Sequence, residues 1–149
     1  MVNPFDLKTL MLAKHAQHVV LVHFPIALFI SGVTFDFLVR WKKVRGLADA
    51  AYFNLMVAAI STVPVLITGL LAWHFALEGQ KLKGLLLLHI SFASISSVLL
   101  WLVWWIHLRA RARVETPSRY VLLLEVVAVG VVALTGHLGG FLSGVNVSL

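Results

Sequence analysis

The feature that most constrains this chain is a series of four long apolar segments separated by short polar links. The segments cover residues 18–41, 51–75, 85–108 and 117–142 of the 149. A helix of about 20 apolar residues crosses the hydrocarbon layer, which is about 30 Å thick. A segment in lipid must satisfy its own backbone hydrogen bonds, and here only a helix does so. The sequence therefore predicts one all-α domain over residues 1–149 with four transmembrane helices.

Composition supports a bilayer as the main partner of this chain. Sixty per cent of the residues are hydrophobic and 12% are charged. A soluble domain of this length has too much surface to hide that much apolar area. The formal net charge of +6 lies in the links, which favours a role in membrane topology over nucleic-acid binding. Since there is no cysteine, disulfides, thiolate metal sites and thiol catalysis are excluded.

The links also predict how the helices are arranged. Because they are short, neighbouring helices should be antiparallel and form an up-down bundle, with the first helix diagonal to the third and the second to the fourth. Eight of the twelve Lys and Arg residues lie in or beside the first and third links: Arg40, Lys42, Lys43, Arg45, Arg109, Arg111, Arg113 and Arg119. The positive-inside rule then places these links in the cytoplasm and both termini outside, in a plasma (bacterial inner) membrane.

Six of the seven histidines fall toward the predicted outer side, and each helix carries at least one. His23, His89 and His137 lie at similar depth inside the apolar layer. Ionisable residues at such depth are rare and usually face the bundle or a site. His18 and His74 lie at the membrane boundary. His107, at the opposite end, is interpreted as an interfacial residue without a role.

This pattern is compatible with b-type haem. Imidazole is a good axial ligand and adds no net charge in lipid. Two ligands at matching depth on diagonal helices favour His23 with His89 on the haem iron, and His74 with His137 as a second pair; His18 is a further cofactor-binding candidate. The small residues around these histidines leave room for a porphyrin, or equally allow close helix packing and interhelical hydrogen bonds.

Two acidic residues lie within the spans on the predicted cytoplasmic side. Asp36 precedes Arg40 by one helical turn, so an ion pair between them is expected. Glu125 has no such partner and is a candidate for proton uptake. Both acids lie at the end opposite most of the histidines, so direct contact with that group is not expected.

Two segments resemble the family of predicted membrane proteins called domain of unknown function 2231. The first is His18-Val-Val-Leu-Val-His23-Phe-Pro-Ile-Ala27, continuing to Asp36, with Val19 in place of the usual proline. The second is Leu134-Thr-Gly-His-Leu-Gly-Gly140, after which the histidine of the family's usual tail is absent. The resemblance implies four transmembrane helices and assigns no activity. Haem is an inference from the histidines alone.

The leading functional hypothesis is a small haem b subunit that transfers electrons between a quinone or larger membrane redox complex and an outer-face acceptor. A structural or assembly subunit without cofactor is the first alternative, and a histidine metal site for zinc or copper, or a small transporter, is the second. No phosphate loop or nucleophile motif is present. We therefore expect an electron-transfer or structural subunit rather than a stand-alone enzyme.

Overall fold

The computed structural model describes residues 14–75, 77–115 and 117–144, and these form helices and short links without a strand. The four spans that the sequence predicts are all present. Helices α2 and α3 make up the first, and the other three are single helices long and apolar enough to cross a membrane. The helices are α2 (Lys14–Leu21), α3 (His23–Lys42), α4 (Ala48–Phe75), α5 (Gly84–Ala112) and α6 (Arg119–Leu142), with a 3₁₀ turn η1 (Arg45–Leu47) before α4.

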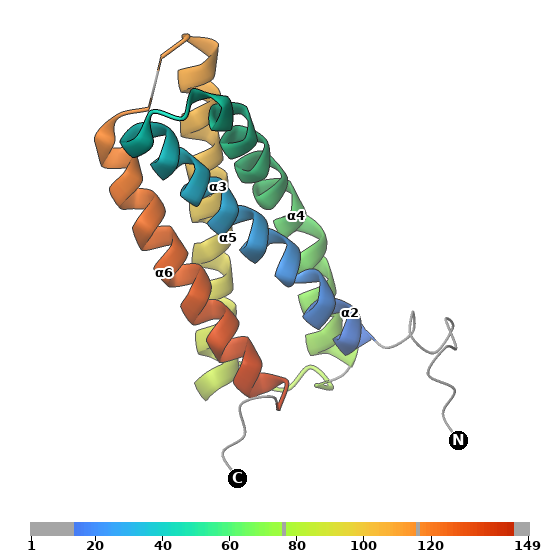
Figure 1. Ribbon diagram of the computed structural model, residues 1–149. Coiled ribbons are helices and arrows are strands. Elements are labelled where there is room, and N and C mark those ends of the chain that lie inside the picture. Colours follow the sequence, from blue (N-terminus) through green and yellow to red (C-terminus); the bar gives the residue numbers. More distant parts are fainter. Residues whose placement is uncertain (1–13, 76, 116, 145–149) are drawn as a thin grey trace.

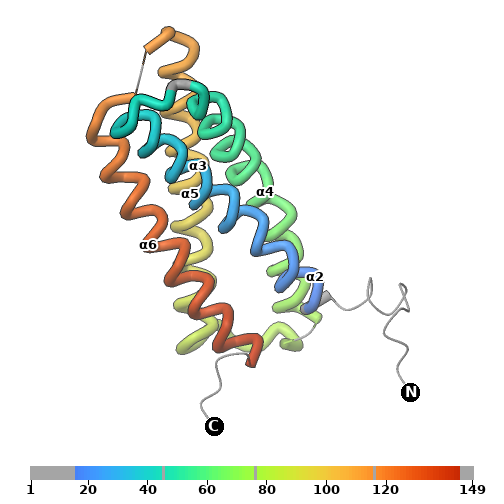
Figure 2. The backbone as a smooth tube through the Cα atoms, in the orientation of Figure 1, coloured from blue at the N-terminus to red at the C-terminus, as the bar shows by residue number. Residues whose placement is uncertain are grey.

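The helices form an up-down bundle (Figure 1). In chain order each helix packs on the next, and α6 closes the bundle by packing on α3. This leaves α3 diagonal to α5 and α4 diagonal to α6, as predicted from the short links. The tube in Figure 2 shows the start of α2, the α4–α5 link and the end of α6 at one end of the bundle. We call this the histidine end, and the opposite end, with the α3–α4 and α5–α6 links, the arginine end.

The first span is broken at Val22, between α2 and α3. Pro25 has no backbone N–H, so the helix loses one of its hydrogen bonds in this turn. The carbonyl that loses this donor is that of Leu21. Two residues earlier, the Val19 carbonyl accepts a hydrogen bond from Nδ1 of His23, at 2.7 Å. The two pieces therefore follow each other with a local irregularity at the point where the histidines are most concentrated.

The helix bounds at the arginine end differ from the prediction. Helix α3 ends one residue later, at Lys42, and helix α4 begins three residues earlier, at Ala48. Helix α5 continues to Ala112, four residues beyond the predicted end at residue 108. Helix α6 begins at Arg119 rather than at Pro117, because Ser118 is its N-cap and accepts a hydrogen bond from the Tyr120 amide at 3.4 Å. Thr116, the residue before the predicted start, lies outside the described residues.

The core cluster contains two buried side chains from each of α3, α4, α5 and α6. Phe29, Leu55, Val103 and Ala128 are all fully buried and belong to the same core cluster. Helices α3 and α4 approach closely at Gly32, where an added Cβ would lie 2.9 Å from Cγ of Leu55. Most other large apolar side chains face outward, as expected for helices surrounded by lipid.

Candidate functional site

His89, on α5, is held against α6 at the histidine end. Its Nδ1 lies 3.2 Å from the Thr135 carbonyl, which can only accept, so Nδ1 donates. The ring lies over Gly139, where an added Cβ would come within 3.1 Å of Cε1. In the neutral imidazole Nε2 then keeps a lone pair, and no group among the described residues hydrogen-bonds to it.

His18, on α2, is held against α4 in the same way. Its Nδ1 lies 3.1 Å from the Val65 carbonyl and 3.3 Å from Oγ1 of Thr68. The ring lies over Gly69, whose added Cβ would be 2.9 Å from Cε1. For both histidines the accepting carbonyl belongs to the residue four positions before the glycine. Helices α2 and α5 therefore each carry one imidazole that is held by a backbone carbonyl and a glycine of the neighbouring helix, α4 and α6 respectively.

The other three histidines at this end lie on exposed parts of their helices. His23 is exposed and bonds to the Val19 carbonyl of its own span. The exposed His137 ring meets Phe141 edge to face, with ring centroids 4.9 Å apart, and the exposed His74 ring meets Phe75 in the same way at 4.7 Å. His23, His89 and His137 thus lie at similar depth, but their side chains do not face one another across the bundle.

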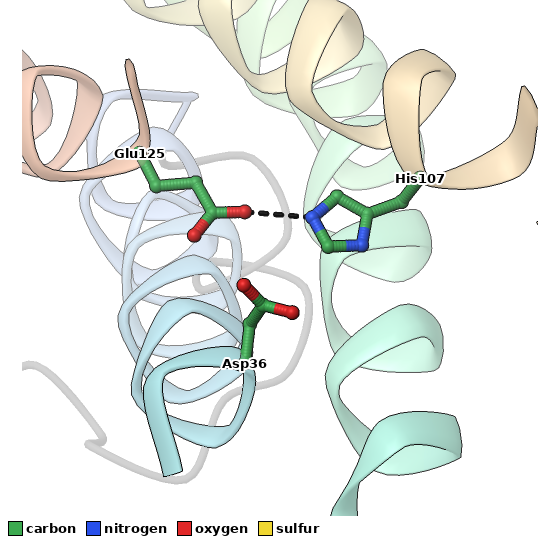
Figure 3. A group of neighbouring side chains, drawn as sticks. All are labelled: Asp36, His107 and Glu125. Carbon is green, nitrogen blue, oxygen red and sulfur yellow. Dashed lines mark hydrogen bonds and ion pairs between the residues drawn. The ribbon is translucent and has the colours of Figure 1, made fainter. Parts of the chain in front are cut away.

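At the arginine end, three ionisable side chains from three helices converge in the interior. Asp36 of α3 is 6% exposed, His107 of α5 is 7% exposed and Glu125 of α6 is fully buried. Figure 3 shows the two carboxyl groups and the imidazole pointing toward one another. Nε2 of His107 lies 2.7 Å from Oε1 of Glu125. One ligand atom from each of the three residues lies within 4.8 Å of the other two.

Arg40 connects this cluster to the start of α6. Its Nε donates to Oδ2 of Asp36 at 2.5 Å, which confirms the ion pair that the sequence predicts. Its Nη1 donates to the carbonyls of Pro117 and Ser118, at 2.8 and 3.1 Å. The guanidinium thus compensates the charge of Asp36 and fixes the first turn of α6 against α3.

Two buried atoms of this cluster have no hydrogen-bond partner among the described residues: Oε2 of Glu125 and Nη2 of Arg40. An unsatisfied buried polar group costs about 1–3 kcal/mol, so native structures contain few of them. At the same end of the bundle, a pocket of about 240 Å³ lies between the end of α5 and the start of α6, with Pro117, Ser118 and Val121 on its α6 side; none of the cluster residues lines it. The cluster is therefore buried, polar and incompletely paired.

The interpretation of His107 as an interfacial residue is wrong, because its ring is buried and bonded to Glu125. A signal for this contact was present in the sequence. His107 and Glu125 are equally distant from the middle of the α5–α6 link, so antiparallel packing places them at the same depth. The expectation that the acids lie apart from the outer histidines agrees with their position at the arginine end.

Comparison with known families supports the membrane assignment. The family model described as "Predicted membrane protein (DUF2231)" matches residues 14–146. The chain belongs to this family. The match covers all helices of the DUF2231 bundle, including both histidine-containing terminal segments and the cluster at the arginine end. No curated protein and no solved structure matches this DUF2231 protein.

Proposed function

We propose that this membrane protein binds b-type haem at its histidine end and transfers electrons there. The observation that carries the proposal is the setting of His89. The Thr135 carbonyl accepts a hydrogen bond from Nδ1, and Gly139, one turn further along α6, lets the ring lie close to that helix. An imidazole fixed in this tautomer offers Nε2 to a metal, and metal-ligating histidines are generally oriented by such a hydrogen bond from their other ring nitrogen.

The donor set at this end fits haem in its chemistry. Two neutral imidazoles add no charge to the bilayer, and there is no cysteine to compete. In the proposal, His89 would be one of the two residues that hold the haem iron. The second comes from the first span, where His23 is the ligand expected from diagonal packing and His18 has the same carbonyl-and-glycine setting as His89. His74 and His137 form the second candidate pair.

When bound, haem supplies a one-electron Fe(III)/Fe(II) couple. The protein's own contribution is to hold the imidazoles and to exclude water with the apolar side chains of the spans. By the positive-inside rule the histidine end faces outward in the plasma membrane. The proposed partners are accordingly a quinol or a larger redox complex within the bilayer and an acceptor at the outer face.

The test is a visible difference spectrum of the full chain, purified in mild detergent from cells supplied with haem. A sharp reduced-minus-oxidised α-band is expected, and His89→Ala should remove it or convert it to a high-spin form. His23→Ala and His18→Ala identify the second ligand, and His74→Ala tests the second pair. His107→Gln, at the opposite end of α5, should leave the spectrum unchanged. Folded protein that contains no haem would refute the proposal.

A structural or assembly role is the second candidate, and the same hydrogen bonds favour it. His18 and His89 each link two helices through a backbone carbonyl, so they stabilise the bundle even without a cofactor. This role predicts that His18→Ala and His89→Ala lower the unfolding temperature in detergent while no haem, zinc or copper is detected in the wild type. A lower stability accompanied by loss of bound haem instead supports the first proposal.

A further inference from the structure

We propose that Asp36, His107 and Glu125 form a binding site for one divalent ion of the first transition series at the arginine end of the bundle. The site is distinct from the histidine end, and the proposal does not depend on haem. His89 and His107 lie on the same helix, 18 residues apart, which corresponds to about 27 Å along its axis.

The geometry of the three side chains is close to that of a coordination shell. Donor atoms around one ion lie about 2.0–2.2 Å from it, and hence at most about 4.4 Å from one another. The three ligand atoms here lie within 4.8 Å of each other. Rotamer adjustments of a few tenths of an ångström would therefore be sufficient to close the shell. Because the ligands come from α3, α5 and α6, the packing of the bundle itself positions them (Figure 3).

The unpaired carboxylate oxygen provides independent support for a ligand. Glu125 is fully buried, and its Oε2 has no hydrogen-bond partner among the described residues. In Figure 3 its carboxyl group faces that of Asp36. Two buried carboxylates that face each other repel unless a cation or a shared proton lies between them.

The charges in the cluster also call for a cation. Asp36 and Glu125 bring two negative charges, and Arg40 compensates one of them. Without an ion, a neutral His107 donates a hydrogen bond from Nε2 to Glu125 but adds no charge; as a ligand through Nε2 it would carry its proton on Nδ1 instead. The cluster is then left with one buried negative charge, which is unfavourable in a low dielectric. A metal ion supplies the missing positive charge and gives Oε2 of Glu125 a partner; a proton is the competing cation.

The donor types indicate which ions fit. One imidazole nitrogen and two carboxylate oxygens, without sulfur, suit Mn²⁺, Fe²⁺ or Zn²⁺. Arg40 acts as a positioning residue, since its bond to Oδ2 of Asp36 orients that carboxylate and leaves Oδ1 for the ion. Its bonds to the carbonyls of Pro117 and Ser118 hold the same guanidinium in place.

The experiment measures Mn²⁺ binding to the full chain in detergent after chelator treatment, by the loss of the free-ion signal in electron paramagnetic resonance. Mn²⁺ is the probe because it prefers carboxylate ligands over sites made only of histidine. We expect one bound ion per chain. Glu125→Gln, Asp36→Asn and His107→Gln should each weaken binding at least 10-fold, since each removes a ligand while retaining the side chain's approximate shape.

Two controls separate this site from the rest of the molecule. Asp49→Asn changes an exposed acid at the same end, which pairs with Arg111, and should leave binding unchanged. His89→Ala should also leave it unchanged. If wild-type protein with native circular dichroism binds neither Mn²⁺ nor Zn²⁺, the proposal is overturned and the cluster holds a proton. Equal loss of binding in Asp49→Asn would overturn it as well. The wild-type stoichiometry decides the matter even if a variant does not fold.

Discussion

A comparison of two glycines on α6 tests whether the His89 ring is held as tightly as the structure indicates. An alanine Cβ at Gly130 would meet no atom within 4 Å, apart from its own helix. An alanine Cβ at Gly139 would lie 3.1 Å from Cε1 and 3.6 Å from Nδ1 of His89. Gly130→Ala and Gly139→Ala thus make the same chemical change on one helix, and only the second affects the imidazole.

The expected magnitudes follow from two opposing contributions. Replacing glycine by alanine within a helix stabilises it by up to about 1 kcal/mol. At Gly139 the ring must move by a few tenths of an ångström, which stretches a 3.2 Å hydrogen bond to the Thr135 carbonyl. Such a bond contributes about 1 kcal/mol. We therefore expect Gly130→Ala to stabilise the bundle and Gly139→Ala to leave it nearly unchanged, a difference of about 1 kcal/mol.

The assay is unfolding of both variants in mixed detergent micelles, followed by far-ultraviolet circular dichroism. Haem content of the same samples is a second readout, because a displaced His89 ring also moves Nε2. Haem content should fall in Gly139→Ala and remain at the wild-type level in Gly130→Ala. If Gly139→Ala gains as much stability as Gly130→Ala and keeps its haem, the ring is not held by the glycine and the reasoning fails.

Three further substitutions test the packing and the polar cluster. Gly32→Ala should destabilise by about 1–3 kcal/mol through overpacking, because its Cβ would lie 2.9 Å from Cγ of Leu55, and a normal unfolding midpoint would contradict this close approach. His107→Ala should destabilise by about 1–3 kcal/mol, because it leaves Oε1 of Glu125 buried without a donor; His107→Gln, which can still donate, should recover part of this loss. Arg40→Lys keeps the charge but cannot form the forked hydrogen bonds, so amide exchange at the start of α6 should become faster than in the wild type.

Much of the architecture could be predicted from the sequence because membrane insertion depends on the length and polarity of continuous segments. The four spans, their antiparallel order and the diagonal relation of α3 to α5 all follow from the apolar runs and short links. Helix ends were less predictable, because they depend on local contacts. Helix α6 begins after Ser118, at the point where Arg40 of α3 donates hydrogen bonds to the carbonyls of Pro117 and Ser118. No pattern within the α5–α6 link itself signals that contact.

The candidate sites show a different limit of the same reasoning. Position along a span gives the depth of a residue, but its direction depends on how each helix is rotated in the bundle. His23 and His89 have similar depth, yet the first lies exposed beside its own backbone and the second is held against α6. The break at Val22 contributes, since it interrupts the helix one residue before His23. Glu125 has no partner one turn along its own helix, and its hydrogen-bond partner is His107 of the neighbouring helix α5.

Helix α5 carries a candidate ligand near each of its ends, and this separation matters for how the two proposals relate. The roughly 27 Å between His89 and His107 is close to the thickness of the hydrocarbon layer, so the two ligand groups lie near opposite faces of the membrane. Between them Leu100 and Val103 of α5 are almost fully buried, while the buried hydroxyls of Ser96 and Thr62 are hydrogen-bonded to Thr135 and Trp101. The interior between the two ends is therefore mostly apolar but contains hydrogen-bonded polar pairs. The two proposed functions, electron transfer at one face and cation binding at the other, are therefore placed at opposite ends of one helix.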